Sequence, residues 1–384
     1  MAIKAEGSPL SFSEIQAELG GSNPISLEEY YKDGNIINND IHDPNGIPNS
    51  GNPISVFDFY RCARRQFAQW SGGNQSNPNG TVSGSFKTHV FTSSRSFNRT
   101  RAPIGTGRDT LHYIVIGGGG GGGTVTGGGG GAGDYMSGSI STGNRTSYYM
   151  RIGAGGTAGA HSGPSTRIVS NGASDRGDDS RIQAGSSNSS TRYVTAIGGG
   201  GGLTYNNYEA SNANDYFANG GSGGGGSGIV DSRRGFDIGP GAGNHGGTGA
   251  EREETLCGGG GGGAGGAGVS GRGNRSSNGA FPDPGIDAAR GGIGVNITGF
   301  PGANGYRAGG GTGGGLRSNA TRTSFSGGGG SGGPGPGIAS TPGGNGAANK
   351  GAGGGGGGYN GNGVGGLGGS GGSGIIAVKY QFQP

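Results

Sequence analysis

Residues 111–123 read LHYIVIGGGGGGG, an apolar β-branched segment that runs directly into a run of glycine. The first part predicts a β-strand, whereas the glycines that follow supply no side chain for a core. Near the other end of the chain, residues 374–382 read GIIAVKYQF and predict a second strand. These two segments bracket the glycine-rich region. We expect them to pair antiparallel and to close that region as one domain.

Glycine accounts for 106 of the 384 residues, and only 10 of these glycines fall within the first 100 residues. Hydrophobic residues make up 28% of the chain and charged residues 13%. These side chains are too few to build the core of a conventional domain of this size, which argues against a large globular enzyme. Collagen is excluded because the glycines form runs instead of marking every third position.

Two features of the glycine pattern suggest how it folds. Ala264 and Ala267 stand three residues apart among glycines, and side chains recur every third residue from Val364 to Ser373. Three residues per turn is the repeat of the polyproline II helix, which has no internal hydrogen bonds. Buried helices of this kind must exchange hydrogen bonds with close neighbours. Uninterrupted glycine runs stand at residues 117–123, 127–131, 198–202, 223–226, 258–263, 327–330 and 353–358.

We therefore predict a mostly irregular fold, a stacked polyglycine-II sandwich closed by a small β-sheet and preceded by a small helical N-terminal attachment domain. A partly disordered glycine linker is the alternative. Residues 84–101 alternate like an exposed hairpin, with Phe86, Val90, Phe91 and Phe97 along it. The expected divisions are a head at 1–70, a linker at 71–80, a hairpin and strand base at 81–116, the sandwich at 117–373 and the closing strand at 374–384.

The head contains a near-repeat, because residues 23–31 (NPISLEEYY) return as residues 52–60 (NPISVFDFY). In both copies a serine, Ser26 or Ser55, stands three residues before an acidic side chain, which is the capping-box pattern of a helix start. Ser11 begins a third such pattern. We expect three short helical turns. A head this small is expected to complete its core against a partner or against copies of itself.

Charge, cysteine and targeting signals limit the function further. Residues 1–70 carry five basic and nine acidic side chains, and the rest of the chain has a net charge of +8. Cys62 and Cys257 form no CxxC pair, so neither a zinc site nor a disulfide framework is predicted. The N-terminus lacks the apolar core of a signal peptide, and no stretch is long and apolar enough to span a membrane.

The order of these segments resembles the glycine-rich domains at the tips of tailed-bacteriophage fibres, and residues 11–31 are similar to a segment common in phage tail and baseplate proteins. The resemblance implies a virion protein whose residues 1–70 attach to other tail or baseplate proteins. It also implies that loops of a polyglycine-II sandwich bind a host surface glycan or outer-membrane protein. A homo-oligomer, with a trimer as the first guess, is expected. The chain departs from some of these adhesins because it carries its own head.

The loops should sort into two ends of the sandwich, if residues 117–133 are one pass kinked at 124–126. Most tyrosines then fall at the end away from the terminal strands. Tyrosine mixed with Ser, Asn and Gly is typical of adaptable binding loops, and an arginine suits sugar acids or phosphate. The alternative for each tyrosine is that it packs as a lid on the sandwich. The candidate receptor-binding residues are Tyr135, Arg145, Tyr148, Tyr149, Tyr205, Asn206, Asn207, Tyr208, Tyr216, Phe217 and Tyr359.

Catalysis, a cofactor, a bound metal and nucleic-acid binding find little support. The histidines are scattered without HExxH spacing, and Arg-Gly-Gly occurs only in isolation, as at Arg290. Residues 175–179 (DRGDD) could bind a cation or imitate an RGD ligand, but we interpret them as a solvated polar loop. The competing functions are an architectural virion protein without receptor binding and a non-viral glycine-rich protein that binds ice or RNA. The five histidines are His42, His89, His112, His161 and His245.

Overall fold

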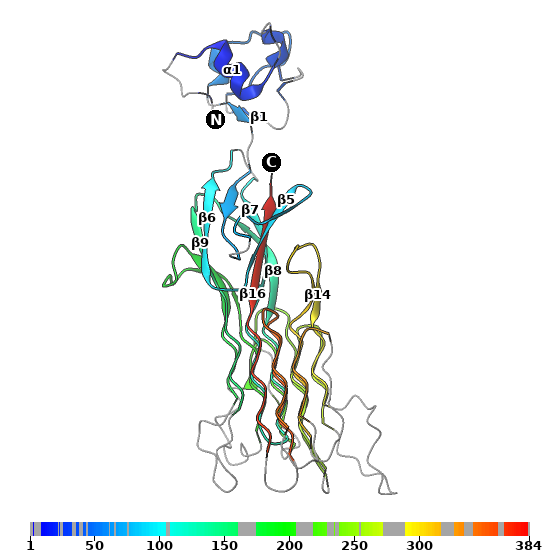
Figure 1. Cartoon of the computed structure of the whole chain (residues 1–384). Coiled ribbons are helices and arrows are strands. Elements are labelled where there is room, and N and C mark those ends of the chain that lie inside the picture. The colour runs from blue at the N-terminus through cyan, green and yellow to red at the C-terminus, as the bar shows by residue number, and fades with distance from the viewer. Residues whose placement is uncertain are drawn as a thin grey trace.

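The long β-strands gather at one end of the glycine-rich part, and extended segments without helix or sheet run on from them (Figure 1). Strands and irregular segments dominate the part that the computed structural model describes, and α1 (Phe12–Leu19) is its one α-helix. This agrees with the predicted glycine-rich, mostly non-helical fold. The structure describes residues 3, 9–21, 23, 26–32, 36–37, 41–43, 45–60, 62–64, 67–74, 77–104, 108–159, 174–204, 218–228, 234, 238–252, 255–271, 289–315, 326–333, 341–359 and 365–382.

The head contains the three short helical turns that the serine patterns predict. Ser11 and Glu14 form a capping box at the start of α1, and Ser55 and Asp58 form one at the 3₁₀-helix η2 (Val56–Phe59). Ser26 caps η1 (Leu27–Tyr30) through the amide of Glu28. A two-residue pairing of β1 (Ile41–His42) with β2 (Ala63–Arg64) joins the two halves. The head has its own core, formed by Ile3, Ile15, Leu19, Tyr30, Ile37, Ile41, Ile47, Phe59 and Cys62.

Two five-stranded sheets form the base of the glycine-rich domain. The first has the order β4-β5-β16-β7-β8, and the second has the order β11-β10-β9-β6-β3. The strands of the first are β4 (Thr81–Ser83), β5 (Phe86–Phe91), β16 (Ile375–Gln381), β7 (Thr110–Ile116) and β8 (Tyr135–Ser141). Those of the second are β11 (Arg192–Ala196), β10 (Ser180–Ala184), β9 (Ser147–Arg151), β6 (Arg95–Arg101) and β3 (Gln69–Ser71).

The predicted pairing of the two terminal strands is confirmed. β16 lies antiparallel to β7, with Ile375 opposite Ile116, and its other edge pairs with β5. The predicted exposed hairpin over residues 84–101 is wrong. β5 and β6 belong to different sheets, and the rings of Phe91 and Phe97, both fully buried, meet edge to face at 5.6 Å. The corner between the two strands carries the chain across the core instead of back along one sheet.

A buried aromatic cluster joins the two sheets. Trp70 of β3 stacks on Phe97 with ring centroids 5.1 Å apart, and His89 of β5 meets Phe97 edge to face at 5.0 Å. Tyr380 of β16 stacks on His89 at 5.8 Å. Most of the large buried side chains of the domain lie in this cluster. The two sheets therefore enclose a conventional hydrophobic core, whereas the passes pack against each other without one.

Beyond the base the chain crosses the domain repeatedly in glycine-rich segments, which we call passes (Figure 1). The interpretation of residues 117–133 as one kinked pass is wrong. Val125 and Thr126 adopt positive φ values of 50° and 52°, which reverse the chain. Residues 127–133 return beside 117–123, and the amide of Gly120 donates to the carbonyl of Gly131 at 2.9 Å. The turn at 124–126 marks what we call the far end, and β7, β8 and β16 mark the strand end.

The passes hold each other by lateral hydrogen bonds with a repeat of three residues. The amides of Gly118, Gly119 and Gly120 donate to three different passes, at Asp178, Gly372 and Gly131. The next three amides donate to the same three passes one step further on, at Asp175, Gly369 and Gly128. The carbonyls of this segment accept from three further passes, so residues 117–123 are surrounded on every side. Residues 127–133, 258–263 and 351–358 are enclosed in the same way.

Close approach explains why the enclosed passes contain almost no side chains. A Cβ atom added at Gly120 would stand 2.1 Å from the carbonyl oxygen of Gly200, and one at Gly122 would stand 2.0 Å from that of Gly355. Passes at the edge carry side chains every third residue instead. Ala154 and Thr157 are exposed in one such pass, while Gly153 and Gly156 face the interior. In residues 153–159 the period of three marks an edge, and the runs at 117–123, 127–131, 258–263 and 353–358 mark enclosed passes. The run at 327–330 instead forms a turn, with positive φ at Gly327 and Gly328. The expectation for Ala264 and Ala267 is also wrong, because Ala264 is buried in a turn closed by the bridge between Gly263 and Gly266.

Two small hairpins stand at opposite ends of the passes. β12 (Ala250–Arg252) pairs with β13 (Thr255–Cys257), where Cys257 bridges to Gly315 at the far end. β14 (Val295–Ile297) pairs with β15 (Gly305–Arg307) at the strand end. The connection between β14 and β15 buries Phe300 against the first sheet, and the Lys379 ammonium group lies 4.7 Å from its ring centre.

Candidate functional site

Four of the candidate receptor-binding residues lie at the strand end and not at the predicted outer end. Tyr135 begins β8, Tyr148 and Tyr149 lie on β9, and Arg145 lies on the connection between these strands. The physical reason is the turn at 124–126, because one reversal more than expected moves the following loop to the opposite end. The prediction that these residues face outward from the far end is therefore wrong.

Tyr148 is a core residue. Its side chain is fully buried, and its ring lies 5.4 Å from the rings of both Trp70 and Tyr193. Burial raises the pKa of Tyr148 to about 12, although the charge of Arg145 acts in the opposite direction. A fully buried ring offers no contact area to a receptor, so Tyr148 packs within the base of the domain and is not a receptor contact.

Arg145 is exposed, but its guanidinium group is held in place by Tyr193. Its Nε donates a hydrogen bond to the hydroxyl of Tyr193 at 2.6 Å, and the guanidinium lies 4.5 Å from the centre of that ring. The hydrogen bond to Tyr193 raises the pKa of Arg145 further above its ordinary value. Because Nε is engaged, the terminal nitrogens of the guanidinium are the atoms left to bind an anion. Arg145 thus remains chemically able to bind an acidic group, but from the strand end.

Tyr149 and Tyr135 are both half-buried. Tyr149 is opposite Ser96 of β6 on one side and Gln183 of β10 on the other, in the middle of the second sheet. Tyr135 exchanges backbone hydrogen bonds with Ala242 and packs against the cluster around Ile114 and Ile116. Both residues contribute to the base of the domain.

Tyr359 lies at the far end, as predicted. It forms a bridge with Gly365, and its amide donates to the carbonyl of Gly315 at 3.2 Å. Leu203 also lies at this end, because its carbonyl accepts from Gly128, directly beside the turn at 124–126. Leu203 and Thr204 lead into the segment that carries most of the remaining candidates. Tyr205, Asn206, Asn207, Tyr208, Tyr216 and Phe217 lie outside the described residues.

Residues 175–179 are not the solvated loop that we expected. They lie in an edge pass, where the carbonyls of Asp175 and Asp178 accept hydrogen bonds from Gly121 and Gly118. The Asp175 carboxylate also accepts a hydrogen bond from the hydroxyl of Thr157 in the next pass. The period of three explains the placement, since Ser174, Gly177 and Ser180 are the buried positions and the charged side chains fall between them.

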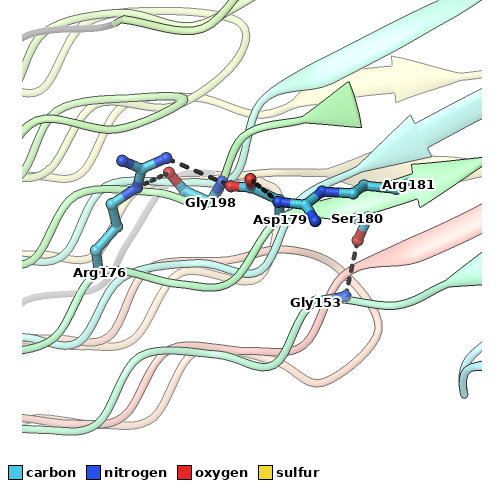
Figure 2. Close-up of polar contacts among 6 residues, drawn as sticks. All are labelled: Gly153, Arg176, Asp179, Ser180, Arg181 and Gly198. Atoms are coloured by element: carbon cyan, nitrogen blue, oxygen red, sulfur yellow. Dashed lines mark hydrogen bonds and ion pairs between the residues drawn. The ribbon is translucent and has the colours of Figure 1, made fainter. Parts of the chain in front are cut away.

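Asp179 anchors the point where passes become strands. Figure 2 shows its carboxylate between Arg176 and Arg181, at 3.4 Å and 2.8 Å, and it also accepts the amide of Gly198 at 3.1 Å. Burial alone would raise the pKa of Asp179, but the hydrogen bonds from Arg181 and Gly198 and the charge of Arg176 outweigh it and lower the pKa. The cluster is a structural joint with its acidic group already engaged, which leaves little to bind a cation.

The described part of the chain contains no group of three or more His, Cys, Asp or Glu side chains placed to hold a metal ion. Within the same residues, no helix has the length and apolar character needed to cross a membrane. Sequence reasoning missed the joint around Asp179 and the aromatic cluster of the base. The spacing of Ser174, Gly177 and Ser180 was the signal for the joint, because it continues the period of three seen in the glycine stretches.

The comparisons with known proteins agree with the pattern of the passes. No curated protein matches the chain. The family described as Glycine-rich domain matches residues 92–381, which extend from the end of β5 to the end of β16. This range covers most of the chain and includes every described pass, whereas β3, β4 and β5 of the two sheets precede it. The chain therefore belongs to the glycine-rich domain family.

Proposed function

We propose that the chain is a virion protein of a tailed bacteriophage, an adhesin that attaches to the tail through residues 1–70 and binds a host cell-surface receptor through the far end. One observation carries the proposal. Tyr359 and the residues that lead into the Tyr205 segment lie at the far end, whereas β7 and β16 lie at the opposite end. A protein held near its strands would present the far end outward.

The finer fold belongs to the same proposal, namely a polyglycine-II sandwich that serves as a rigid platform. The supporting observation is the rotation of amide donors among three neighbours with a period of three, as in residues 118–123. Hydrogen bonds on all sides of an enclosed pass leave few ways for it to bend. A crystal structure tests this directly, since residues 117–123 should have φ near −75° and ψ near +145°.

The receptor chemistry follows from composition. The segment from Tyr205 to Phe217 mixes Tyr and Phe with Asn, Asp and Ser. Such side chains give large contact area at low entropic cost together with adaptable hydrogen bonds, which suits a surface glycan or the loops of an outer-membrane protein. The proposal needs no catalysis and no cofactor.

Adsorption of the purified full chain to host cells, together with competition against virions, tests the adhesin. The double variant Tyr205→Ala/Tyr208→Ala and the single variant Tyr359→Ala should each weaken adsorption at least tenfold. Arg145→Ala and Tyr149→Ala at the strand end are the controls and should leave adsorption unchanged. If the unmodified chain neither adsorbs nor competes, the adhesin is excluded and the architectural virion role becomes the better proposal.

A further inference from the structure

The near-repeat in the head gives two copies of one turn that can be compared position by position. In the first copy the amide of Glu28 donates to the Ser26 hydroxyl at 3.2 Å, and in the second the amide of Phe57 donates to the Ser55 hydroxyl at 3.1 Å. Two residues further on, Tyr30 and Phe59 are both fully buried, and their rings meet edge to face at 5.7 Å. The two turns therefore share the serine cap and the buried aromatic side chain, although only the second has a complete capping box.

The most marked difference between the copies is at the second residue after the capping serine. The first copy carries Glu28 there, an ordinary choice for a surface position near a helix start. The second carries Phe57, whose side chain is 65% exposed. Phe12 and Phe57 are the only exposed phenylalanines in the described part of the chain, and both belong to the head. The fold of the turn does not require a phenyl ring at this position, since its twin forms with glutamate.

Phe57 is exposed on a turn that is firmly held. The Asp58 carboxylate accepts the amide of Ser55 at 2.7 Å, which completes the capping box. The side-chain amide of Asn45 donates to the carbonyl of Phe57 at 3.2 Å and to that of Tyr60 at 2.9 Å. The Phe57 ring lies 5.8 Å from the ring of the largely buried Tyr60. A large apolar side chain on a pre-organised turn is the type of residue that dominates binding interfaces, because little entropy is lost when it is buried.

Charge decides what kind of surface would cover Phe57. The head as a whole has nine acidic and five basic side chains. Among its described side chains, Lys32 is the single base beside six acids, Glu14, Glu18, Glu28, Glu29, Asp43 and Asp58. A second copy of this head would bring like charges together, which is unfavourable at an interface. A basic partner would be attracted to it.

We infer that Phe57 is the anchor of the attachment surface, and that it inserts into an apolar pocket with a basic rim on a different protein. The inference rests on the proposed function, which makes that protein a component of the tail. Phe57 supplies the buried contact, and the acidic side chains of the head orient the approach.

The test measures binding of the full chain to tails purified from particles that lack it. The variant Phe57→Glu gives the second copy the residue that the first copy has at the same position, so its thermal unfolding should match that of the unmodified chain. Its affinity for the tails should fall at least tenfold. Phe57→Trp, which keeps an aromatic ring, should retain most of the affinity. Val82→Glu replaces another exposed apolar side chain, on β4 of the base, and should have no effect.

A variant that exchanges the two residues distinguishes specific binding at position 57 from nonspecific binding by any exposed phenylalanine. Glu28→Phe/Phe57→Glu has the same composition as the unmodified chain, and we expect it to bind as weakly as Phe57→Glu alone. Binding of the unmodified chain should also weaken as salt is raised. The inference is overturned if Phe57→Glu binds normally, if the swap restores binding, or if Phe57→Glu converts an oligomer of this chain into a monomer. If the unmodified chain does not bind tails at all, the proposed attachment itself fails.

Discussion

The hydroxyl of Tyr380 donates a hydrogen bond to the backbone carbonyl of Trp70 and accepts one from its amide, each at 3.1 Å. The two residues are 310 positions apart in the sequence. Trp70 lies on β3 at the edge of one sheet, and Tyr380 lies on β16 at the centre of the other. This pair of hydrogen bonds therefore connects the beginning and the end of the glycine-rich domain within its buried core.

Replacing Tyr380 by Phe should destabilise the protein by about 1–3 kcal/mol, because both backbone groups of Trp70 lose this buried partner. Thermal or denaturant unfolding of the full chain measures the effect. Tyr113→Phe on the neighbouring strand β7 is the control, with an expected change below about 0.5 kcal/mol. Equal stability of the two variants would show that the Tyr380 hydroxyl does not stabilise the core.

His89 should make stability depend on pH. Burial lowers the pKa of His89 to about 4, against the hydrogen bond to the Gly72 carbonyl, which acts to raise it. In the unfolded chain this residue binds a proton near pH 6.5, whereas in the folded protein it does so only near pH 4. The unfolded state is therefore increasingly favoured as the pH falls from about 6.5 to about 4. The free energy of unfolding is expected to fall by about 3 kcal/mol over that interval.

The contribution of His89 is isolated by comparing unfolding free energies of the unmodified chain and His89→Phe from pH 7 to pH 4. His89→Phe should lose less stability than the unmodified chain over this interval, because it has no histidine at this position to take up a proton on unfolding. A difference that stays constant would contradict the assignment to His89.

Adding a single methyl group to an enclosed pass should cost more than adding a larger group to an edge. In Gly120→Ala the new Cβ would stand 2.1 Å from the carbonyl oxygen of Gly200. Neither pass can move away from this contact without breaking its hydrogen bonds to the other passes around it. We expect a loss of at least about 3 kcal/mol, above the usual range for overpacking. Ala154→Leu adds three carbons at an exposed edge position and should change stability by less than about 0.5 kcal/mol. Similar melting temperatures for the two variants would rule out the tight packing described above.

Neutralising Asp179 should loosen the joint between passes and strands. Asp179→Asn leaves Arg176 and Arg181 partly buried without their counter-charge, and we expect a loss of about 1–3 kcal/mol. Asp178→Asn is the matched control, because that side chain is exposed in the same pass. Because the pKa of Asp179 is lowered, its contribution is present at neutral pH and is lost as the pH falls through the pKa of the folded state. The gap in stability between Asp179→Asn and the unmodified chain should therefore narrow in acid.

Local patterns in the sequence were enough to predict the two terminal strands, β7 and β16, and the turns of the head, but not most of the other strands of the two sheets. The apolar runs that end at Ile116 and begin at Ile375 pair as expected, and the serine patterns at Ser11, Ser26 and Ser55 all cap helical turns. The corner between β5 and β6 was not predictable in this way. Alternation along one strand is the same whether the next strand lies beside it or across a core.

The candidate site was predicted less well, because its placement depends on counting reversals of the chain. Val125 and Thr126 reverse the chain with positive φ values, a conformation that non-glycine residues rarely adopt and that the sequence Thr-Val-Thr does not suggest. This missed reversal moved Tyr135, Tyr148 and Tyr149 to the wrong end. The pass around residues 175–179, which we expected to be a loop, is a second omission that restores the count, so Leu203 lies at the predicted end. Tyr359 also lies at the predicted end.

The enclosed passes have a consequence for how the domain finds its alignment. A run such as residues 117–123 contains no side chain that distinguishes one alignment from another. A slip by three residues would return every amide to the same neighbouring pass. The glycine segments therefore cannot choose their own register. It must be set where side chains resume, by Ile116 opposite Ile375 at one end and by the turn at Val125 and Thr126 at the other. The strands thus act as the template that aligns the part of the protein with no side chains.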